Sequence, residues 1–229
     1  MKLIAIDGNS LMHRAYYALP NMTNKAGTPT GALHGFLSML LKLVDMRPDY
    51  LLVAFDMPIK TFRHEKYADY KAGRRETPDD LRTQFPLLQE LLKKMGIAVI
   101  ECERFEADDI LGTLARMAEE SGDCTAYLLT GDRDALQLIS PRVHVLLAGN
   151  NETTDMDEAA FTARYGITPD RFVDVKALMG DTSDNIPGVP GIGEKGACKL
   201  VQTWGTVENI LSNVERIKGR QGESIAARG

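Results

Sequence analysis

The chain alternates short apolar runs with longer segments in which apolar residues recur at helical spacing. Short apolar runs occupy residues 3–6, 50–55 and 126–129, with weaker ones at 97–100 and 143–147. Runs of this length, bounded by turn residues, predict buried strands. Residues 31–46, 79–95 and 107–120 carry apolar side chains three and four positions apart, which predicts helices. Strands that alternate with helices are typical of an α/β fold with a mostly parallel central sheet flanked by helices.

The pattern changes near residue 165, after which no further strand-like run occurs. Residues 180–197 are rich in glycine and proline, and residues 199–204 have a helical pattern. We therefore predict two parts. Residues 1–165 form the α/β core, with a basic arch at 60–78, and residues 166–229 form a helical subdomain.

Three of the predicted strands are followed by aspartate. Asp7 and Asp56 end the first two runs, and Asp132 follows the third after Thr130 and Gly131. The carboxyl ends of parallel strands meet at one edge of a sheet, where ligands bind in open α/β folds. We therefore expect these three carboxylates to converge.

Composition narrows the class of protein. Hydrophobic residues make up 44% of the chain and charged residues 26%, which is typical of a folded protein and excludes a disordered one. No run of about 18 apolar residues is present, so no membrane partner is expected. The first residues lack the layout of a secretory signal, which favours a cytoplasmic location. The three cysteines form no CxxC pair, which argues against a structural zinc site.

Acidic residues form further clusters along the chain. Acids in the first turn of a helix, or in a turn, have an ordinary structural explanation. Nine of them brought together would repel one another strongly unless cations were bound. Oxygen ligands alone favour Mg²⁺ or Mn²⁺, and a pair of such ions catalyses in-line displacement at phosphodiesters. The nine candidates are Asp7, Asp56, Glu106, Asp108, Asp109, Asp132, Asp134, Asp181 and Asp184.

The remaining charge is compatible with a nucleic acid partner. The chain has 27 basic and 32 acidic residues, a net charge of −5, but without the nine candidates 23 acids remain against the 27 bases. Residues 60–78 combine lysine and arginine with interleaved aromatic residues. A solvated basic helix would explain this segment. Its position directly after Asp56 favours a second interpretation, in which cations neutralise phosphates and an aromatic ring stacks on an unpaired base.

Residues 188–197, GVPGIGEKGA, resemble the hairpin of helix-hairpin-helix DNA-binding elements. Glycine lets the backbone approach a phosphate or a monovalent cation, and the start of the following helix favours an anion. Gly191, Gly193 and Lys195 are the candidate DNA contacts in this segment.

Six ordered strings carry a family resemblance over nearly the whole chain. They are IDGNSLMHRAYYA, VAFD, FRHEKYADYKAGR, FEADDILGTLA, LTGDRDALQL and GDTSDNIPGVPGIGEKGA. The sequence resembles the 5′-nuclease domain at the N-terminus of bacterial DNA polymerase I, of the flap endonuclease superfamily. The resemblance implies a monomeric 5′-3′ exonuclease and flap endonuclease that acts on 5′ flaps, nicks, 5′ ends and RNA-primer/DNA hybrids. It also implies a role in replication and repair, a polymerase domain in cis or in trans, and association with the bacterial nucleoid.

The same resemblance implies roles for individual residues. The nine acids would hold two Mg²⁺ ions, with Mn²⁺ as substitute, and Asp7, Asp56, Glu106, Asp108 and Asp109 would lie nearest the chemistry. Lys71 and Arg74 match the basic pair that acts on the scissile phosphate, and Tyr70 matches the aromatic residue that stacks on the terminal nucleotide. Arg14 and Arg63 match further phosphate contacts. The backbone carbonyls of Val189 and Ile192 would bind K⁺.

The sequence departs from the family at two places. Gly196 stands where the family usually has threonine, and the resemblance implies that Gly229 lies within the family's closing helices, so we expect the subdomain to be truncated there. Two alternatives stay open, a non-catalytic or truncated DNA-binding module and a PIN-like ribonuclease. The complete set of acids favours an enzyme over the first, and the basic segment with the hairpin favours a flap nuclease over the second.

Overall fold

The computed structural model describes residues 1–19, 22–149 and 152–228 of the 229-residue chain. These residues form two compact units. The first unit contains Met1–Phe62 and Arg75–Met156, and the second contains Arg63–Arg74 and Asp157–Gly229. The middle of the basic segment therefore groups with the C-terminal residues. No helix within the described residues is long and apolar enough to cross a membrane.

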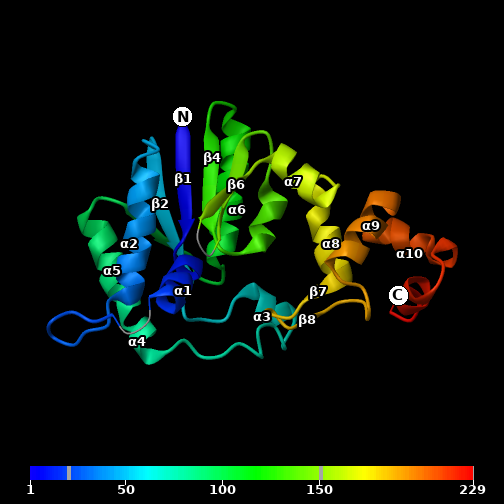
Figure 1. Cartoon of the computed structure of the whole chain (residues 1–229), viewed down its shortest axis with the longest axis horizontal. Helices are drawn as coiled ribbons and strands as arrows, with labels where there is room; N and C mark the ends of the chain where they lie inside the picture. The colour runs from blue at the N-terminus through cyan, green and yellow to red at the C-terminus, as the bar shows by residue number, and fades with distance from the viewer. Residues whose placement is uncertain (20–21, 150–151, 229) are drawn as a thin grey trace. The chain divides into compact units, whose positions relative to one another are not determined.

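The first unit is built on one six-stranded sheet (Figure 1). Its strand order is β3-β2-β1-β4-β5-β6, and every neighbouring pair is parallel except β5 and β6. The predicted mostly parallel sheet is thereby confirmed. The structure adds an antiparallel edge strand, β6, which the apolar pattern does not reveal. The strands are β1 (Lys2–Asp7), β2 (Tyr50–Phe55), β3 (Ala98–Glu101), β4 (Thr125–Thr130), β5 (Val143–Ala148) and β6 (Thr153–Met156).

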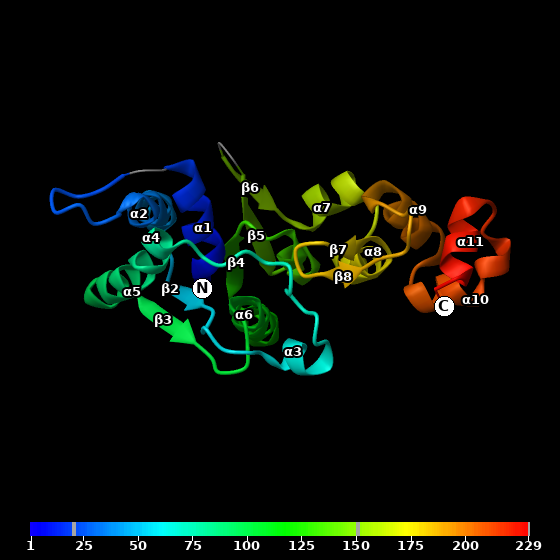
Figure 2. The ribbon, with the colours of Figure 1, turned by 90° about the horizontal axis from the view of Figure 1, so that it is seen from below.

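Helices cover both faces of this sheet. Figure 2 shows α1 and α2 on one face and α6 on the other. The core under α1 and α2 is apolar, and Phe36, Phe55 and Leu88 in it are buried. The helical elements of this unit are α1 (Gly8–Ala18), α2 (Gly31–Val44), α4 (Asp79–Arg82), α5 (Gln84–Lys94), α6 (Ala107–Ser121) and the 3₁₀ helix η1 (Arg133–Leu138).

Two helices differ from the sequence-based expectation. Residues 7–10 have the composition of a turn, but Asp7 caps α1, which starts directly after β1. The predicted helix over 79–95 is interrupted at Thr83. Pro86 explains the interruption, because proline has no N–H to bond to the Arg82 carbonyl and its ring would collide with that group.

The second unit is mainly helical. Its N-terminal part contains most of α3 (Phe62–Lys66). Two very short antiparallel strands, β7 and β8, pair Gly180 with Pro187, which corrects the expectation that no strand follows residue 165. The remaining elements are α7 (Glu158–Tyr165), η2 (Pro169–Arg171), α8 (Phe172–Met179), β7 (Gly180–Asp181), β8 (Ile186–Pro187), α9 (Glu194–Trp204), α10 (Val207–Ser212), η3 (Val214–Arg216) and α11 (Arg220–Ala226).

Candidate active site

The carboxyl edge of the large sheet brings together three of the predicted acids. Asp7 ends β1, Asp56 follows β2, and Asp132 follows β4. The chain continues from β1 to β2 on one side and from β4 to β5 on the other, so the connections diverge between the neighbouring strands β1 and β4. Such a switch point opens the crevice in which open α/β folds bind their ligands. The expected convergence of the three aspartates is confirmed.

Asp7 is the most buried of these acids, with 5% of its surface exposed. Its Oδ1 accepts a hydrogen bond from the Ser10 amide at 2.9 Å, and its Oδ2 accepts one from the Thr130 hydroxyl at 2.8 Å. Burial raises the pKa of Asp7 to about 6, the two hydrogen bonds oppose this rise, and the negative charges of Asp56 and Asp132 add to it. The edge therefore concentrates negative charge.

Three polar side chains without charge tie the strand ends together. Asn9 accepts a hydrogen bond from the Asp56 amide at 3.0 Å, and the Ser10 hydroxyl accepts one from the Gly131 amide at 2.9 Å. The Thr130 hydroxyl bonds Asp7 and also accepts from the Asp132 amide at 3.0 Å. Sequence reasoning missed these residues. Hydroxyl and amide side chains directly beside strand-end acids are the signal that identifies them.

The start of α6 adds the next group of acids. Asp56 accepts a hydrogen bond from the Ala107 amide at 2.7 Å, which fixes the end of β2 to this helix. Glu106 is buried and forms a capping box with Asp109, whose carboxylate accepts from the Glu106 amide at 2.9 Å. Asp108 lies half-buried in the same turn. The helix start therefore presents three carboxylates in the first unit.

Asp132 and Asp134 occupy the start of η1. Asp132 caps this short helix by accepting from the Asp134 amide at 2.9 Å. Within the described residues, no three side chains of histidine, cysteine, aspartate or glutamate are grouped so that they could hold one ion. The ligand set therefore stays a prediction. Its chemistry fits a hard divalent cation, because every donor is a carboxylate oxygen and the charges of Asp56 and Asp132 act on Asp7.

Asp184 lies in the second unit, where it contacts the basic segment. Its carboxylate accepts a hydrogen bond from Tyr70 at 3.1 Å and pairs with Arg74 at 2.8 Å, and its carbonyl accepts from the Lys71 amide at 3.0 Å. Tyr70 is 6% exposed, and the edge of the His64 ring lies against it. The Tyr70 ring, which we expect to stack on a nucleotide, is therefore packed within the second unit in this structure.

Asp181 lies in the same turn and has a different set of partners. It pairs with Lys176 at 2.5 Å and accepts hydrogen bonds from the Ser183 amide at 2.7 Å and the Asp184 amide at 3.2 Å. Burial raises its pKa, but Lys176 and Ser183 outweigh burial and bring the pKa down to about 2. Asp181 is therefore ionised throughout the neutral range.

The glycine-rich hairpin links α8 to α9. Gly191 has a positive φ of 80°, a conformation that favours glycine, and Gly193 caps α9, whose first turn contains Lys195. The Val189 carbonyl accepts from the Ile192 amide at 3.1 Å, and Ile192 is buried. The predicted hairpin is present, with its backbone tightly turned.

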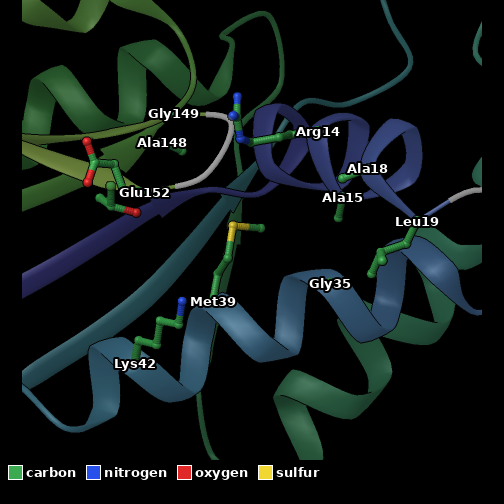
Figure 3. A pocket seen from close by; sticks show the side chains of 11 residues that line it. Arg14, Ala15, Ala18, Leu19, Gly35, Met39, Lys42, Ala148, Gly149 and Glu152 are labelled. Atoms are coloured by element: carbon green, nitrogen blue, oxygen red, sulfur yellow. The ribbon is translucent and has the colours of Figure 1, made fainter.

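The two further predicted phosphate contacts, Arg14 and Arg63, lie in different units. Arg63 is on α3 and half-buried. Arg14 lines a pocket of about 200 Å³ between α1, α2 and the β5–β6 connection. Figure 3 shows the Arg14 guanidinium and the Lys42 amine approaching this pocket from opposite sides of Met39.

Comparison with known proteins identifies the family. Residues 2–166 match the 5′-3′ exonuclease N-terminal resolvase-like domain. The chain belongs to the 5′-3′ exonuclease family. Residues 167–228 match the family's C-terminal SAM fold. The resemblance inferred from the six strings is confirmed.

Curated relatives of this exonuclease chain include bacterial DNA polymerases I. The enzyme of Bacillus caldotenax is 49% identical over 223 residues, which cover 96% of this chain and 25% of that protein. The Thermus aquaticus enzyme is 42% identical over 226 residues, covering 99% of this chain and 27% of that protein. The chain therefore spans about a quarter of the length of the relatives it matches.

Solved structures share the exonuclease fold. The T5 5′-exonuclease with bound divalent zinc ions matches with a TM-score of 0.79 and 22% identity, over 99% of this chain and 84% of that chain. The catalytic core of Rad2 in complex with DNA substrate matches with a TM-score of 0.60 and 18% identity, over 99% and 71% of the two chains. At these identities the likeness establishes the fold alone.

Proposed function

We propose that this chain is a structure-specific 5′-nuclease that hydrolyses phosphodiester bonds of DNA and of RNA primers, as a 5′-3′ exonuclease and flap endonuclease. One observation carries the proposal. In a chain of the 5′-3′ exonuclease family, Asp7, Asp56 and Asp132 converge at the switch point of a parallel sheet and interact electrostatically. A buried carboxylate beside two further carboxylates is costly for stability, and such costs are typical of functional sites.

We propose divalent cations as cofactors, Mg²⁺ in the cell and Mn²⁺ as a substitute, with two ions per site. The nine acids would hold them, and the T5 relative was solved with divalent metal ions. When bound, two such ions activate a water molecule and stabilise the leaving oxygen of an in-line displacement. The chain's own residues hold the acids in place: Asn9, Ser10 and Thr130 fix the strand ends.

The second unit supplies the proposed contacts to the substrate. Lys71 and Arg74 would neutralise the phosphate, Tyr70 would stack on the terminal nucleotide, and Arg63 would contact a further phosphate. In the first unit we assign the same role to Arg14.

The hairpin would bind the duplex. Gly191, Gly193 and Lys195 would contact its backbone, and the carbonyls of Val189 and Ile192 would bind K⁺. We accordingly assign catalysis to a domain over residues 1–165 and duplex binding to one over 166–229. The Rad2 relative was solved with its DNA substrate, which agrees with this choice of partner.

The curated relatives support our proposals for partners and location. Those relatives are bacterial DNA polymerases I, so we propose that a polymerase region acts with this nuclease in replication and repair. The substrates would be DNA with 5′ flaps, nicks or 5′ ends and RNA-primer/DNA hybrids. We further propose a monomer that works in the bacterial cytoplasm on nucleoid DNA.

The direct experiment is cleavage of an end-labelled 5′-flap duplex by the 229-residue chain. We expect release of the flap near the junction in Mg²⁺ or Mn²⁺ and no cleavage in chelator, with DNA binding retained in chelator. Binding without cleavage in either metal would contradict the proposal and favour a DNA-binding module. Equal cleavage of a single-stranded RNA would favour a ribonuclease.

A further inference from the structure

We propose that Thr130 is a positioning residue that sets the spacing of the acids on β1 and after β4. The inference rests on the proposed metal site at the carboxyl edge. Thr130 ends β4 and is completely buried. Its position opposite the end of β1 places its hydroxyl between two of the candidate ligands, Asp7 and Asp132.

The hydroxyl uses its donor and an acceptor position at the same time. It donates to Asp7 Oδ2 at 2.8 Å and accepts from the Asp132 amide at 3.0 Å. A hydroxyl has a single proton, so the donation to Asp7 defines its orientation and leaves its lone pairs for Asp132. One side chain therefore fixes a carboxylate on one strand and the backbone after another.

The effect extends to the next acid along the chain. Asp132, whose amide is held by Thr130, caps η1 by accepting from the Asp134 amide at 2.9 Å. The hydrogen bonds thus run from Asp7 through Thr130 to Asp132 and Asp134. Oδ1 of Asp7 accepts a hydrogen bond from Ser10 and Oδ2 accepts one from Thr130, and each carboxylate oxygen has a further lone pair for a cation.

Two variants separate this role from simple packing. Thr130→Val keeps the shape and the buried methyl group but loses both hydrogen bonds. Thr130→Ser keeps the hydroxyl and loses the methyl group. If the hydroxyl positions the acids, the serine variant retains metal binding and the valine variant does not. If the side chain only fills space, the order is reversed.

The measurement is Mn²⁺ binding to the full chain without DNA, by calorimetry and by electron paramagnetic resonance. Loss of a hydrogen bond to a metal ligand typically weakens metal binding 10–100-fold, so we expect the dissociation constant of Thr130→Val to rise at least about tenfold. Thr130→Ser should bind like the wild type. Thr203→Val is the matched control, because it also loses a threonine hydroxyl bond, to the Lys199 carbonyl.

A second measurement needs no metal. The Asp132 amide donates to the Thr130 hydroxyl, so its hydrogen exchange in chelator should be slow in the wild type and in Thr130→Ser and fast in Thr130→Val. Unchanged Mn²⁺ binding and unchanged exchange in Thr130→Val would overturn the positioning role. Weaker binding in Thr130→Ser than in Thr130→Val would overturn it as well. A wild-type chain that binds no Mn²⁺ would overturn the proposed metal site itself, which distinguishes the two failures.

Discussion

The guanidinium of Arg74 lies 2.8 Å from the carboxylate of Asp184, so a proposed phosphate contact and a proposed metal ligand are paired with each other. Around this pair, Tyr67 donates to the Asn185 carbonyl at 3.2 Å and Asn185 donates to the Asp69 carbonyl at 2.9 Å. The segment 67–74 is therefore anchored on the turn at 183–185 by both backbone and side chains.

This anchoring predicts that Asn185→Ala loosens the basic segment. The variant loses the bond to Asp69, and alanine is less favourable than asparagine at the positive φ of 57° found here. Hydrogen exchange of the Lys71 amide, which donates to the Asp184 carbonyl, should become faster. Asn213→Ala is the control, because the two bonds it loses, to the Asn209 carbonyl and from Arg216, do not involve the segment 67–74. Unchanged exchange at Lys71 would show that the turn does not anchor the segment.

The start of α6 allows the structural and the chemical role of Asp109 to be separated. Asp109→Asn keeps an oxygen that can accept from the Glu106 amide, so we expect a stable protein that binds flap DNA but does not cleave it. Asp109→Ala loses this cap. Its free energy of unfolding should therefore be about 0.5–2 kcal/mol lower than that of Asp109→Asn, the usual cost of a lost cap. Unfolding in urea and flap cleavage would be measured together.

Asp157→Asn is the control for Asp109→Asn, because Asp157 caps α7 by accepting from the Ala160 amide. It should cleave at the wild-type rate. Cleavage by Asp109→Asn at that same rate would remove Asp109 from the metal site.

The raised pKa of Asp7 predicts how stability depends on pH in chelator. Asp7 ionises near 3.8 in the unfolded chain and near 6 in the folded protein. Between these values the folded state binds the proton more tightly, so the free energy of unfolding falls as the pH rises from about 4 to 6. The rise in the pKa of Asp7 from 3.8 to about 6 means that ionisation of Asp7 lowers the free energy of unfolding by about 3 kcal/mol.

Asp7→Asn removes the charge and with it this loss of about 3 kcal/mol in the free energy of unfolding. The amide nitrogen cannot accept the hydrogen bond that Thr130 donates, which costs about 1 kcal/mol. At pH 8 we therefore expect the variant to be more stable than the wild type by about 2 kcal/mol. At pH 4 the gain should disappear. Urea unfolding of both proteins across this range gives the comparison, and parallel pH profiles would contradict the raised pKa.

Gly196 occupies the first turn of α9. A Cβ there would lie 2.9 Å from Nε2 at the far end of the Gln221 side chain, which a change of rotamer could move away. Gly196→Ala should therefore raise the free energy of unfolding by about 0.5 kcal/mol. Gly205→Ala, at the other end of α9 and with a φ of 84°, should lower it by about 1 kcal/mol. Thermal unfolding tests both, and a loss of stability in Gly196→Ala would indicate that Gln221 is fixed.

The strand-end acids could be predicted from the sequence because strand order was not needed to place them. Any parallel arrangement brings Asp7, Asp56 and Asp132 to one edge. The neutral side chains between them could not be predicted. The Thr130 hydroxyl reaches Asp7 across 123 positions, and only the pairing of β1 with β4 brings them together.

Local signals were ambiguous elsewhere. Residues 7–10 have turn composition, but the same polar residues also start helices, as they do here at the beginning of α1. The strands β7 and β8 have two residues each, too few for a periodic pattern. The anchoring of 67–74 on 183–185 depends on contacts more than 100 positions apart, which no local pattern records.

The most direct test of the acidic edge compares the two ends of β2. Asp56 follows this strand, whereas Asp49 precedes it and accepts from the Lys2 amide at 2.6 Å. Asparagine at either position keeps an oxygen that can accept the existing backbone hydrogen bond. The measurement is the single-turnover rate of 5′-flap cleavage in saturating Mg²⁺. In Asp56→Asn the rate should fall at least roughly 1,000-fold, which corresponds to about 4 kcal/mol of transition-state stabilisation. In Asp49→Asn it should stay at the wild-type rate. Wild-type cleavage by Asp56→Asn, or an equal loss in both variants, would contradict the assignment of the chemistry to the carboxyl edge.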